Sequence, residues 1–293
     1  VEEPFVADQP VEERRIPLER TRIPIDVQDA LGRFTEAADV TEACGPDNAI
    51  ASFRAMSKMT AAQRDTALGS GAIALMLNEW LEQRFQLPSP AVPDLSREAS
   101  PEAAAVALRS DWCLGELPIK NMVHLLEAKG VRVFSLAIDA VEVDAFSMWR
   151  GSTPLVFLNT RKSAEHSRFD AAHELGHLVL HRHGSPQGRE AEHQANQFAS
   201  AFLMPRPSMC ADAPRMATIP NLIKLKRVWS VSLAALIYRL HTVGVLSDWH
   251  YQSLFIDISQ QGYRKAEPEP AQREISRLLQ KVFASLREDR VGR

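Results

Sequence analysis

Two histidines and a glutamate lie close together in the stretch RFDAAHELGHLVLH, residues 168–181. His173 and His177 are four residues apart, so on a helix both imidazoles lie on one face and can bind the same Zn²⁺ ion. Glu174 would lie beside the remaining coordination position, where a carboxylate can take a proton from a water that the metal activates. The apolar residues within this stretch indicate that the helix packs against a hydrophobic core. The pattern predicts metal-assisted hydrolysis.

A catalytic zinc needs a third protein ligand. The candidates for this third ligand lie further along the chain and are four in number: His181, His183, Glu190 and Glu192. His181 is two helical turns beyond His173, about 12 Å at 1.5 Å per residue. It is therefore expected to support a ligand or to interact with the helix C-terminus instead. His183 has the spacing of HExxHxxGxxH, but Leu180 occupies the position where that pattern needs glycine.

The next predicted helix, over 188–203, favours Glu192 among the glutamates. Glu192 and Asn196 share a stripe that borders the apolar face, whereas Glu190 falls on the opposite, solvated side. Because a buried glutamate without a cation is costly, Glu192 is the favoured third ligand. Asn196, one turn further on, is predicted to hydrogen-bond a metal-bound histidine and so to hold its ring in place.

Periodicity also predicts the surrounding elements. Helices are predicted over 46–86, 166–182, 188–203, Ile219–Trp229, Leu233–Val243 and Pro270–Arg287, with two more in 101–130, the second of which opens at Pro118 and ends at Gly130. Strands are predicted over Val131–Leu136, Val143–Arg150 and Pro154–Asn159, with the last two forming a hairpin. The expected fold is α+β, zincin-like, with a small and mostly antiparallel sheet packed on helices that include the HExxH helix.

Four regions follow from this reading. Residues 1–45 are charged and are expected to form a flexible arm. Residues 46–100 contain a helical segment and a proline-rich linker, and residues 101–210 form the predicted metallopeptidase core. Residues 211–293 form a helical C-terminal region.

Composition excludes several classes of protein. The 293 residues are 45% hydrophobic, and 34 Lys and Arg balance 37 Asp and Glu, which argues against bulk electrostatic coating of nucleic acid. Three scattered cysteines fit a reducing compartment rather than a disulfide framework. Neither a signal peptide nor an apolar run of about 18 residues is present, so a cytoplasmic protein with no membrane partner is predicted.

The string RFDAAHELGHLVLH, followed by E-x-Q-A-N-x-F-A-x-x-F-L-M-P at 192–205, resembles the ImmA/IrrE zinc metallopeptidases. The segments 52–60, 117–131, 143–163 and 222–241 extend the resemblance over roughly 50–270. It implies a gluzincin-type zinc site, with His173, His177 and Glu192 as ligands and Glu174 as general base. It also implies a narrow activity, the cleavage of a repressor or helix-turn-helix regulator in phage, mobile-element or stress responses.

One departure from that family concerns DNA binding. The resemblance is greatest to a longer version of the family, which usually carries an N-terminal helix-turn-helix domain of the Cro/repressor type. Residues 1–45 do not resemble such a domain, and this weakens the case for direct DNA binding. Residues 222–241 have the pattern of a helix, a short turn and a second helix. Four basic side chains there could contact phosphate: Lys224, Lys226, Arg227 and Arg239. A helical pair that covers the peptidase core is the simpler interpretation.

Two questions stay open at the level of sequence. Arg168, Tyr238 and His241 are candidates for stabilising an oxyanion, and spacing does not decide among them. The alternative function is a non-proteolytic regulatory module that binds DNA or a toxin–antitoxin partner and keeps a structural or vestigial zinc site. The intact Glu174, which binds no metal, favours the peptidase. The strand over 143–150 could be an edge that pairs with an extended substrate.

Overall fold

A computed structural model describes residues 61–136, 145–182 and 188–291. The arm over 1–45 and the first part of the helix predicted over 46–86 lie outside these residues. The described helices are α3 (Ala61–Arg84), α4 (Pro101–Asp111), α5 (Met122–Ala128), α6 (Ala164–Leu180), α7 (Arg189–Leu203), α8 (Arg206–Asp212), α9 (Ile219–Trp229), α10 (Leu233–Thr242), α11 (Asp248–Gln260) and α12 (Arg277–Val291). The strands are β1 (Arg132–Leu136), β2 (Phe146–Arg150) and β3 (Thr153–Asn159). The α+β class is confirmed.

The three strands form one sheet in the order β1-β3-β2. β3 is central, runs parallel to β1 and pairs antiparallel with β2. The sheet is therefore mixed, which corrects the expectation of a mostly antiparallel sheet. The predicted hairpin is present: Gly151, with φ 58°, turns the chain between β2 and β3 in a conformation that glycine adopts without strain.

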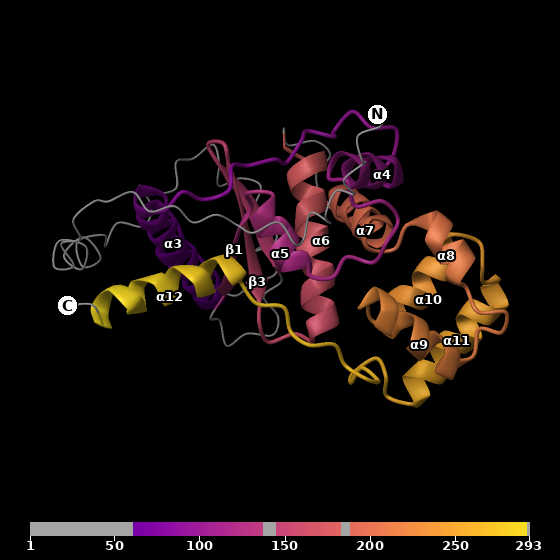
Figure 1. Cartoon of the computed structure of the whole chain (residues 1–293). Coiled ribbons are helices and arrows are strands. Elements are labelled where there is room, and N and C mark those ends of the chain that lie inside the picture. Colours follow the sequence, from indigo (N-terminus) through magenta and orange to yellow (C-terminus); the bar gives the residue numbers. More distant parts are fainter. Residues whose placement is uncertain (1–60, 137–144, 183–187, 292–293) are drawn as a thin grey trace, which may run out of the picture.

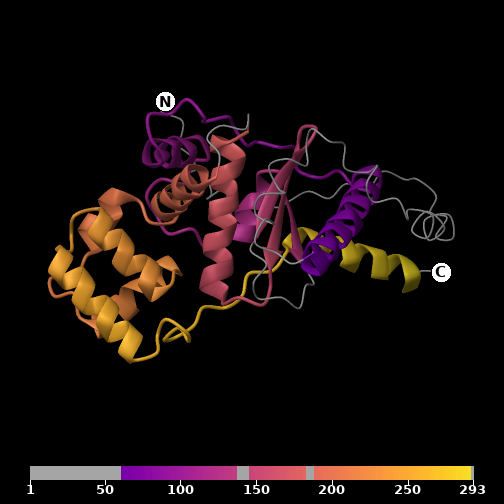
Figure 2. The ribbon, with the colours of Figure 1, turned by 180° about the vertical axis from the view of Figure 1, so that it is seen from behind.

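Alternation along the strands separates two apolar layers. Val156 and Leu158 of β3 join the main core, which α5, α6 and α7 also line. Phe157 points to the other face and stacks on Phe146, with ring centroids 4.4 Å apart. Helices α3 and α12 lie on that side of the molecule, opposite α6 (Figures 1 and 2), where they share a small apolar cluster. The sheet is thus covered on both faces.

Helices α6 and α7 pack closely against each other, and one glycine sets how closely. A Cβ placed on Gly176 of α6 would lie 3.0 Å from the Phe198 ring and 3.3 Å from the Ala195 backbone of α7. Two buried arginines hold the far end of α7: Arg109 donates to the Phe202 carbonyl, and Arg239 donates to the Met204 carbonyl. Helix α7 is therefore held by close packing against α6 along its middle and by hydrogen bonds at its C-terminal end.

Several predicted boundaries change in the structure. The second helix of the 101–130 region begins at Met122 rather than at Pro118, because Asn121 caps it by accepting from the His124 amide. The last helix begins at Arg277 rather than at Pro270, where the Glu127 carboxylate accepts from the Arg277 and Leu278 amides. Helices α8 and α11 were not predicted, and α9 matches its prediction at both ends.

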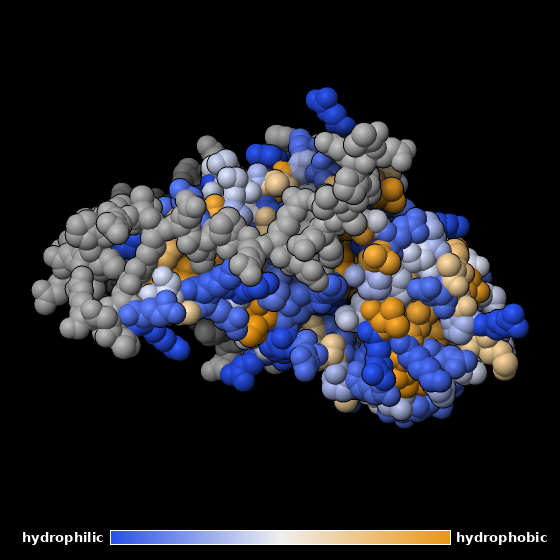
Figure 3. All heavy atoms as spheres, viewed as in Figure 1, coloured by the Kyte–Doolittle hydropathy of each residue, from blue (hydrophilic) through white to orange (hydrophobic). Residues whose placement is uncertain are grey.

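The C-terminal helices α8 to α11 lie beside α7, on the side of the core away from α3 and α12 (Figure 1). The surface in Figure 3 is mostly hydrophilic, and hydrophobic residues gather over these C-terminal helices. Among the described residues, no helix has both the length and the apolar composition that a membrane crossing requires.

Candidate metal centre

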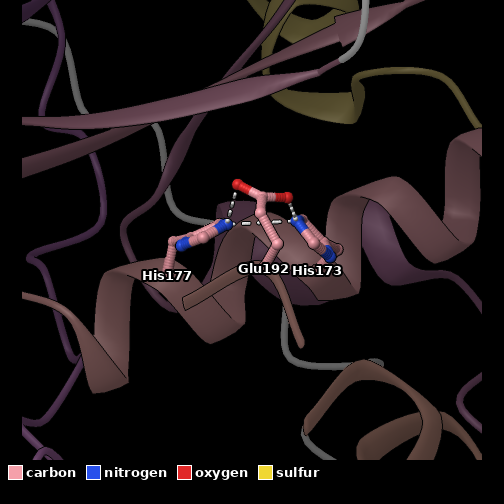
Figure 4. Close-up of side chains that lie close together, drawn as sticks. All are labelled: His173, His177 and Glu192. Carbon is pink, nitrogen blue, oxygen red and sulfur yellow. Dashed lines mark hydrogen bonds and ion pairs between the residues drawn. The ribbon is translucent and has the colours of Figure 1, made fainter. Parts of the chain in front are cut away.

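Three potential ligands converge where α6 meets the first turn of α7 (Figure 4). The Nε2 atoms of His173 and His177 lie 3.0 Å apart. The Glu192 carboxylate faces both rings, with one oxygen 3.4 Å from His173 Nε2 and the other 3.6 Å from His177 Nε2. Among the described residues, this is the group of His, Cys, Asp and Glu side chains that could hold a metal ion.

The spacing of these atoms fits a zinc ion. Ligand atoms about 2.0–2.1 Å from zinc and at tetrahedral angles lie about 3.3–3.4 Å from one another. The two Nε2 atoms lie 3.0 Å apart, and each lies 3.4 or 3.6 Å from its nearer carboxylate oxygen, Oε2 for His173 and Oε1 for His177, so these separations are close to that value. Two imidazoles and a carboxylate also form a ligand set typical of catalytic zinc. The side chains present therefore fit the metal that the motif predicts.

Glu192 differs from its predicted environment. Its side chain is 58% exposed, so the argument from the cost of a buried glutamate does not describe this residue. Glu192 reaches the histidines because it lies in the first turn of α7, where the helix passes the HExxH face of α6. An exposed carboxylate on one side of two partly buried imidazoles leaves the group accessible from solvent.

Glu174 is buried at the interface between α6 and β2. Ser147 of β2 points toward α6, and its hydroxyl donates to Glu174 Oε2 over 2.6 Å. Burial raises the pKa of Glu174 to about 7, against the opposing effects of the His173 charge and the Ser147 hydrogen bond. A carboxylate with a pKa near neutrality is suited to accept and return a proton at neutral pH.

The pKa values of the two histidines are shifted in opposite directions. Burial, followed by the charge of His173, lowers the pKa of His177 to about 3. Burial also acts to lower the pKa of His173, but the Glu192 hydrogen bond and the charges of Glu174 and Glu192 outweigh it and raise that pKa. His177 is thus neutral and can offer a lone pair, as a metal ligand must.

Both ring nitrogens on the far side of the centre have partners. His173 Nδ1 lies 3.1 Å from Asn196 Oδ1, the position in which a metal ligand is commonly supported. His177 Nδ1 lies 2.9 Å from Nδ1 of His181, which is the C-cap residue of α6. The structure therefore places Asn196 and His181 against the predicted ligands, while His183 lies outside the described residues.

The candidates for oxyanion stabilisation have other partners. Arg168 is buried, forms an ion pair with Glu274 and donates to the Ile119 carbonyl. His241 Nε2 lies 2.7 Å from Asp248 Oδ1 among the C-terminal helices. Tyr238 is 43% exposed on α10, and no interaction described for it reaches the metal group.

Two of the four basic residues proposed for phosphate contact are buried in ion pairs. Lys226 Nζ lies 3.0 Å from Glu165 Oε1, and Arg239 binds the Glu102 carboxylate through both terminal nitrogens. Arg227 is exposed but pairs with Glu269. Lys226 and Arg239 thus tie α9 to α6 and α10 to α4, whereas Arg227 and Lys224 are exposed.

Sequence reasoning did not identify Ser147, Gln194 or the contact that Glu190 makes. Ser147 lies in a predicted strand, and its alternation with Phe146 and Met148 was the available signal for the face it occupies. Which helix that face would meet depends on the tertiary packing. Gln194 and Glu190 lie four residues apart on α7, a spacing at which side chains commonly meet.

The sequence around this site was compared with known protein families. Residues 126–241 match the family model Peptidase_M78, described as the IrrE N-terminal-like domain. No curated protein matches the sequence. The matched span holds β2, α6 and α7, and with them Ser147, the HExxH residues and Glu192. This part of the chain belongs to the ImmA/IrrE family and is a metallopeptidase domain.

Proposed function

We propose that this chain is a zinc-dependent endopeptidase that cleaves a repressor or helix-turn-helix transcriptional regulator and so controls phage, mobile-element or stress-response genes. The observation that carries the proposal is the convergence of His173, His177 and Glu192, beside the buried carboxylate of Glu174. When bound, zinc would polarise the scissile carbonyl and increase the acidity of water at the site.

Glu174 supplies the proton transfers in this proposal. It accepts a proton from the attacking water as the carbon–oxygen bond forms, and it returns a proton to the leaving amine as the peptide carbon–nitrogen bond breaks. The Ser147 hydroxyl donates to one carboxylate oxygen, Oε2, and in this proposal the other oxygen, Oε1, takes up the proton. Burial keeps competing water away and holds the pKa of this carboxyl near neutrality.

The position of strand β2 favours a substrate that offers an extended segment. In the sheet that the structure describes, β2 pairs with β3 along one side only. The same strand carries Ser147, whose hydroxyl donates to the Glu174 carboxylate, so a segment paired with β2 would lie near this carboxylate. A flexible linker of a regulator protein could pair with this edge through main-chain hydrogen bonds, whereas a folded domain could not. This gives a physical reason for narrow selectivity.

The test combines metal content with a search for new chain ends. The purified wild type should hold about one zinc per chain, Glu192→Ala should lose it, and Glu174→Gln should keep it. Each protein is then incubated with a native cell extract to which a panel of helix-turn-helix regulators has been added, and new N-termini are identified by mass spectrometry.

We expect new termini within regulator linkers for the wild type and none for Glu174→Gln, since a missing general base costs about 10²–10⁴-fold in rate. Equal cleavage by Glu174→Gln would exclude the assigned base. A wild type that holds no zinc in zinc-replete medium and produces no new termini would instead favour the non-proteolytic regulatory module.

A further inference from the structure

The third histidine of α6 connects the metal centre to two polar residues of α7. His181 lies between His177 on its own helix and Gln194 on α7, and Gln194 in turn contacts Glu190. We infer that Glu190, Gln194 and His181 form a hydrogen-bond chain that fixes the tautomer and orientation of His177 for metal binding. The inference rests on the proposed zinc site and assigns to it three positioning residues.

The direction of the chain follows from its first member. A carboxylate at neutral pH only accepts hydrogen bonds. Gln194 Nε2 donates to Glu190 Oε1 over 3.0 Å, so the amide group of Gln194 can point only one way. Its carbonyl oxygen Oε1 is then the atom that faces His181 Nε2, at 3.2 Å. Because that oxygen cannot donate, the proton in this contact must be on His181 Nε2.

The same argument continues through the two imidazoles. A neutral histidine that carries its proton on Nε2 has a bare Nδ1, which can only accept. His181 Nδ1 lies 2.9 Å from His177 Nδ1, so the proton in that contact belongs to His177. His177 then has a bare Nε2, and this is the atom that faces His173 Nε2 and Glu192. The opposite tautomer would direct an N–H at the metal position.

The chain also explains why His177 and His173 are supported differently. His173 Nδ1 has the amide of Asn196 as its partner, and an amide can present either its oxygen or its nitrogen. For His177, the chain ends on a carboxylate, which removes that ambiguity. The negative charge of Glu190 at the far end further favours a basic, electron-rich imidazole at the metal. The side chains come from both helices, so the chain also ties the first turn of α7 to the end of α6.

The first experiment measures zinc affinity by competition with a chromophoric chelator. His181→Phe removes the acceptor for His177 Nδ1, and we expect zinc to bind about 10–100-fold more weakly. His181→Asn places an amide oxygen near the position of the lost Nδ1, so it should retain most of the wild-type affinity. Gln194→Met breaks the chain one step further from the metal and should give a smaller loss. It also serves as a second test if His181→Phe fails to fold.

The matched control is His193→Phe, the same substitution at an exposed histidine of α7 that contacts Gln197 and lies outside the chain. Its zinc affinity should equal that of the wild type. If His181→Phe and Gln194→Met also bind zinc like the wild type while Glu192→Ala loses it, the chain does not position His177 and the inference is overturned. The proposed peptidase would survive that result.

A second measurement needs no bound zinc. In the metal-free protein, ¹⁵N shifts of the imidazole nitrogens report which one carries the proton. We expect His177 to be protonated at Nδ1 in the wild type and to become a mixture of tautomers in Gln194→Met. A wild-type His177 protonated at Nε2 would refute the chain even if zinc binds. A wild type that binds no zinc but shows the Nδ1–H form would refute the zinc peptidase and leave the chain intact.

Discussion

The two halves of helix α6 carry similar polar residues and use them in opposite ways. In the N-terminal half, Glu165 and Arg168 are buried, and each has a partner of opposite charge in Lys226 and Glu274. In the C-terminal half, His173 and His177 turn their Nε2 atoms toward each other and toward Glu192. That second group offers two ring nitrogens and a carboxylate, which are the atom types that bind a metal ion.

The comparison shows how a charged residue in a helix can be assigned a role. Glu165 accepts from Lys226 and from the Ala271 amide, so its contacts hold the C-terminal segment against α6. Glu192 instead faces the two imidazoles of His173 and His177, and its side chain is 58% exposed. Two imidazoles and a carboxylate that converge on one point indicate a group that could hold a metal ion, whereas carboxylates paired with Lys or Arg indicate packing.

The largest expected change in stability comes from breaking the buried ion pair in the N-terminal half of α6. Lys226→Met removes the cation from Glu165 and Glu267 and leaves buried negative charge, which typically costs about 3–5 kcal/mol of unfolding free energy. The change should appear as a lower midpoint in urea denaturation. Zinc affinity of the folded variant should equal that of the wild type. A variant as stable as the wild type would show that the two halves do not differ in this way.

A smaller effect is expected where α6 meets α7. Gly176→Val places methyl groups against Phe198 and the Ala195 backbone, and overpacking of this kind costs about 1–3 kcal/mol. Because α7 must shift to relieve the contact, Glu192 moves with it and zinc should bind more weakly. Gly71→Val on α3 is the matched control, since a Cβ there meets no atom within 4 Å. Equal zinc affinity in both variants would mean that the α6–α7 contact does not position Glu192.

The effect of Lys226→Met on unfolding free energy should also depend on pH, because the Glu165 carboxyl of this ion pair takes up a proton in acid. Burial acts to raise the pKa of Glu165, but backbone hydrogen bonds and Lys226 outweigh it, so the pKa of this carboxyl is lowered from its ordinary value. A lowered carboxyl pKa adds stability that is present above the unfolded-state pKa and is lost as pH falls through the folded-state pKa. Without Lys226 the buried carboxyl should protonate at higher pH, and protonation relieves the unpaired charge.

The difference in unfolding free energy between wild type and Lys226→Met should therefore be greatest near pH 7 and should shrink in acid, first as Glu165 protonates in the variant and then as it protonates in the wild type. Urea titrations at several pH values provide the measurement. A difference that stays constant with pH would mean that Glu165 is not the group that Lys226 stabilises.

The smallest effect is expected at an exposed ion pair near the same helices. Arg227 and Glu269 are 65% and 55% exposed, with 3.0 Å between Arg227 Nη1 and Glu269 Oε2. Surface pairs contribute about 0–1 kcal/mol, so Arg227→Ala should change unfolding free energy only slightly. The variant serves as the control for Lys226→Met, one position away in sequence. A loss as large as that of Lys226→Met would contradict the ranking by burial.

Much of the local structure could be read from periodicity. The 3.6-residue repeat gives α6, α7, α9 and α10 nearly at their observed bounds, and alternation gives the three strands. Helix starts were less predictable where a cap comes from a distant residue. Glu127 caps α12 across about 150 positions of sequence, and no local pattern contains that contact. The parallel pairing of β1 with β3 is likewise a long-range feature.

The sequence by itself determined that His173 and His177 share one helix face with Glu174 between them, because helical geometry depends only on spacing along the chain. It also narrowed the third ligand to the start of the next helix. Only the tertiary structure decided that Glu192 meets the histidines, that Ser147 holds Glu174, and that Lys226 and Arg239 are buried in ion pairs. These contacts join residues on different elements, and the packing of α6, α7 and the sheet sets their distances.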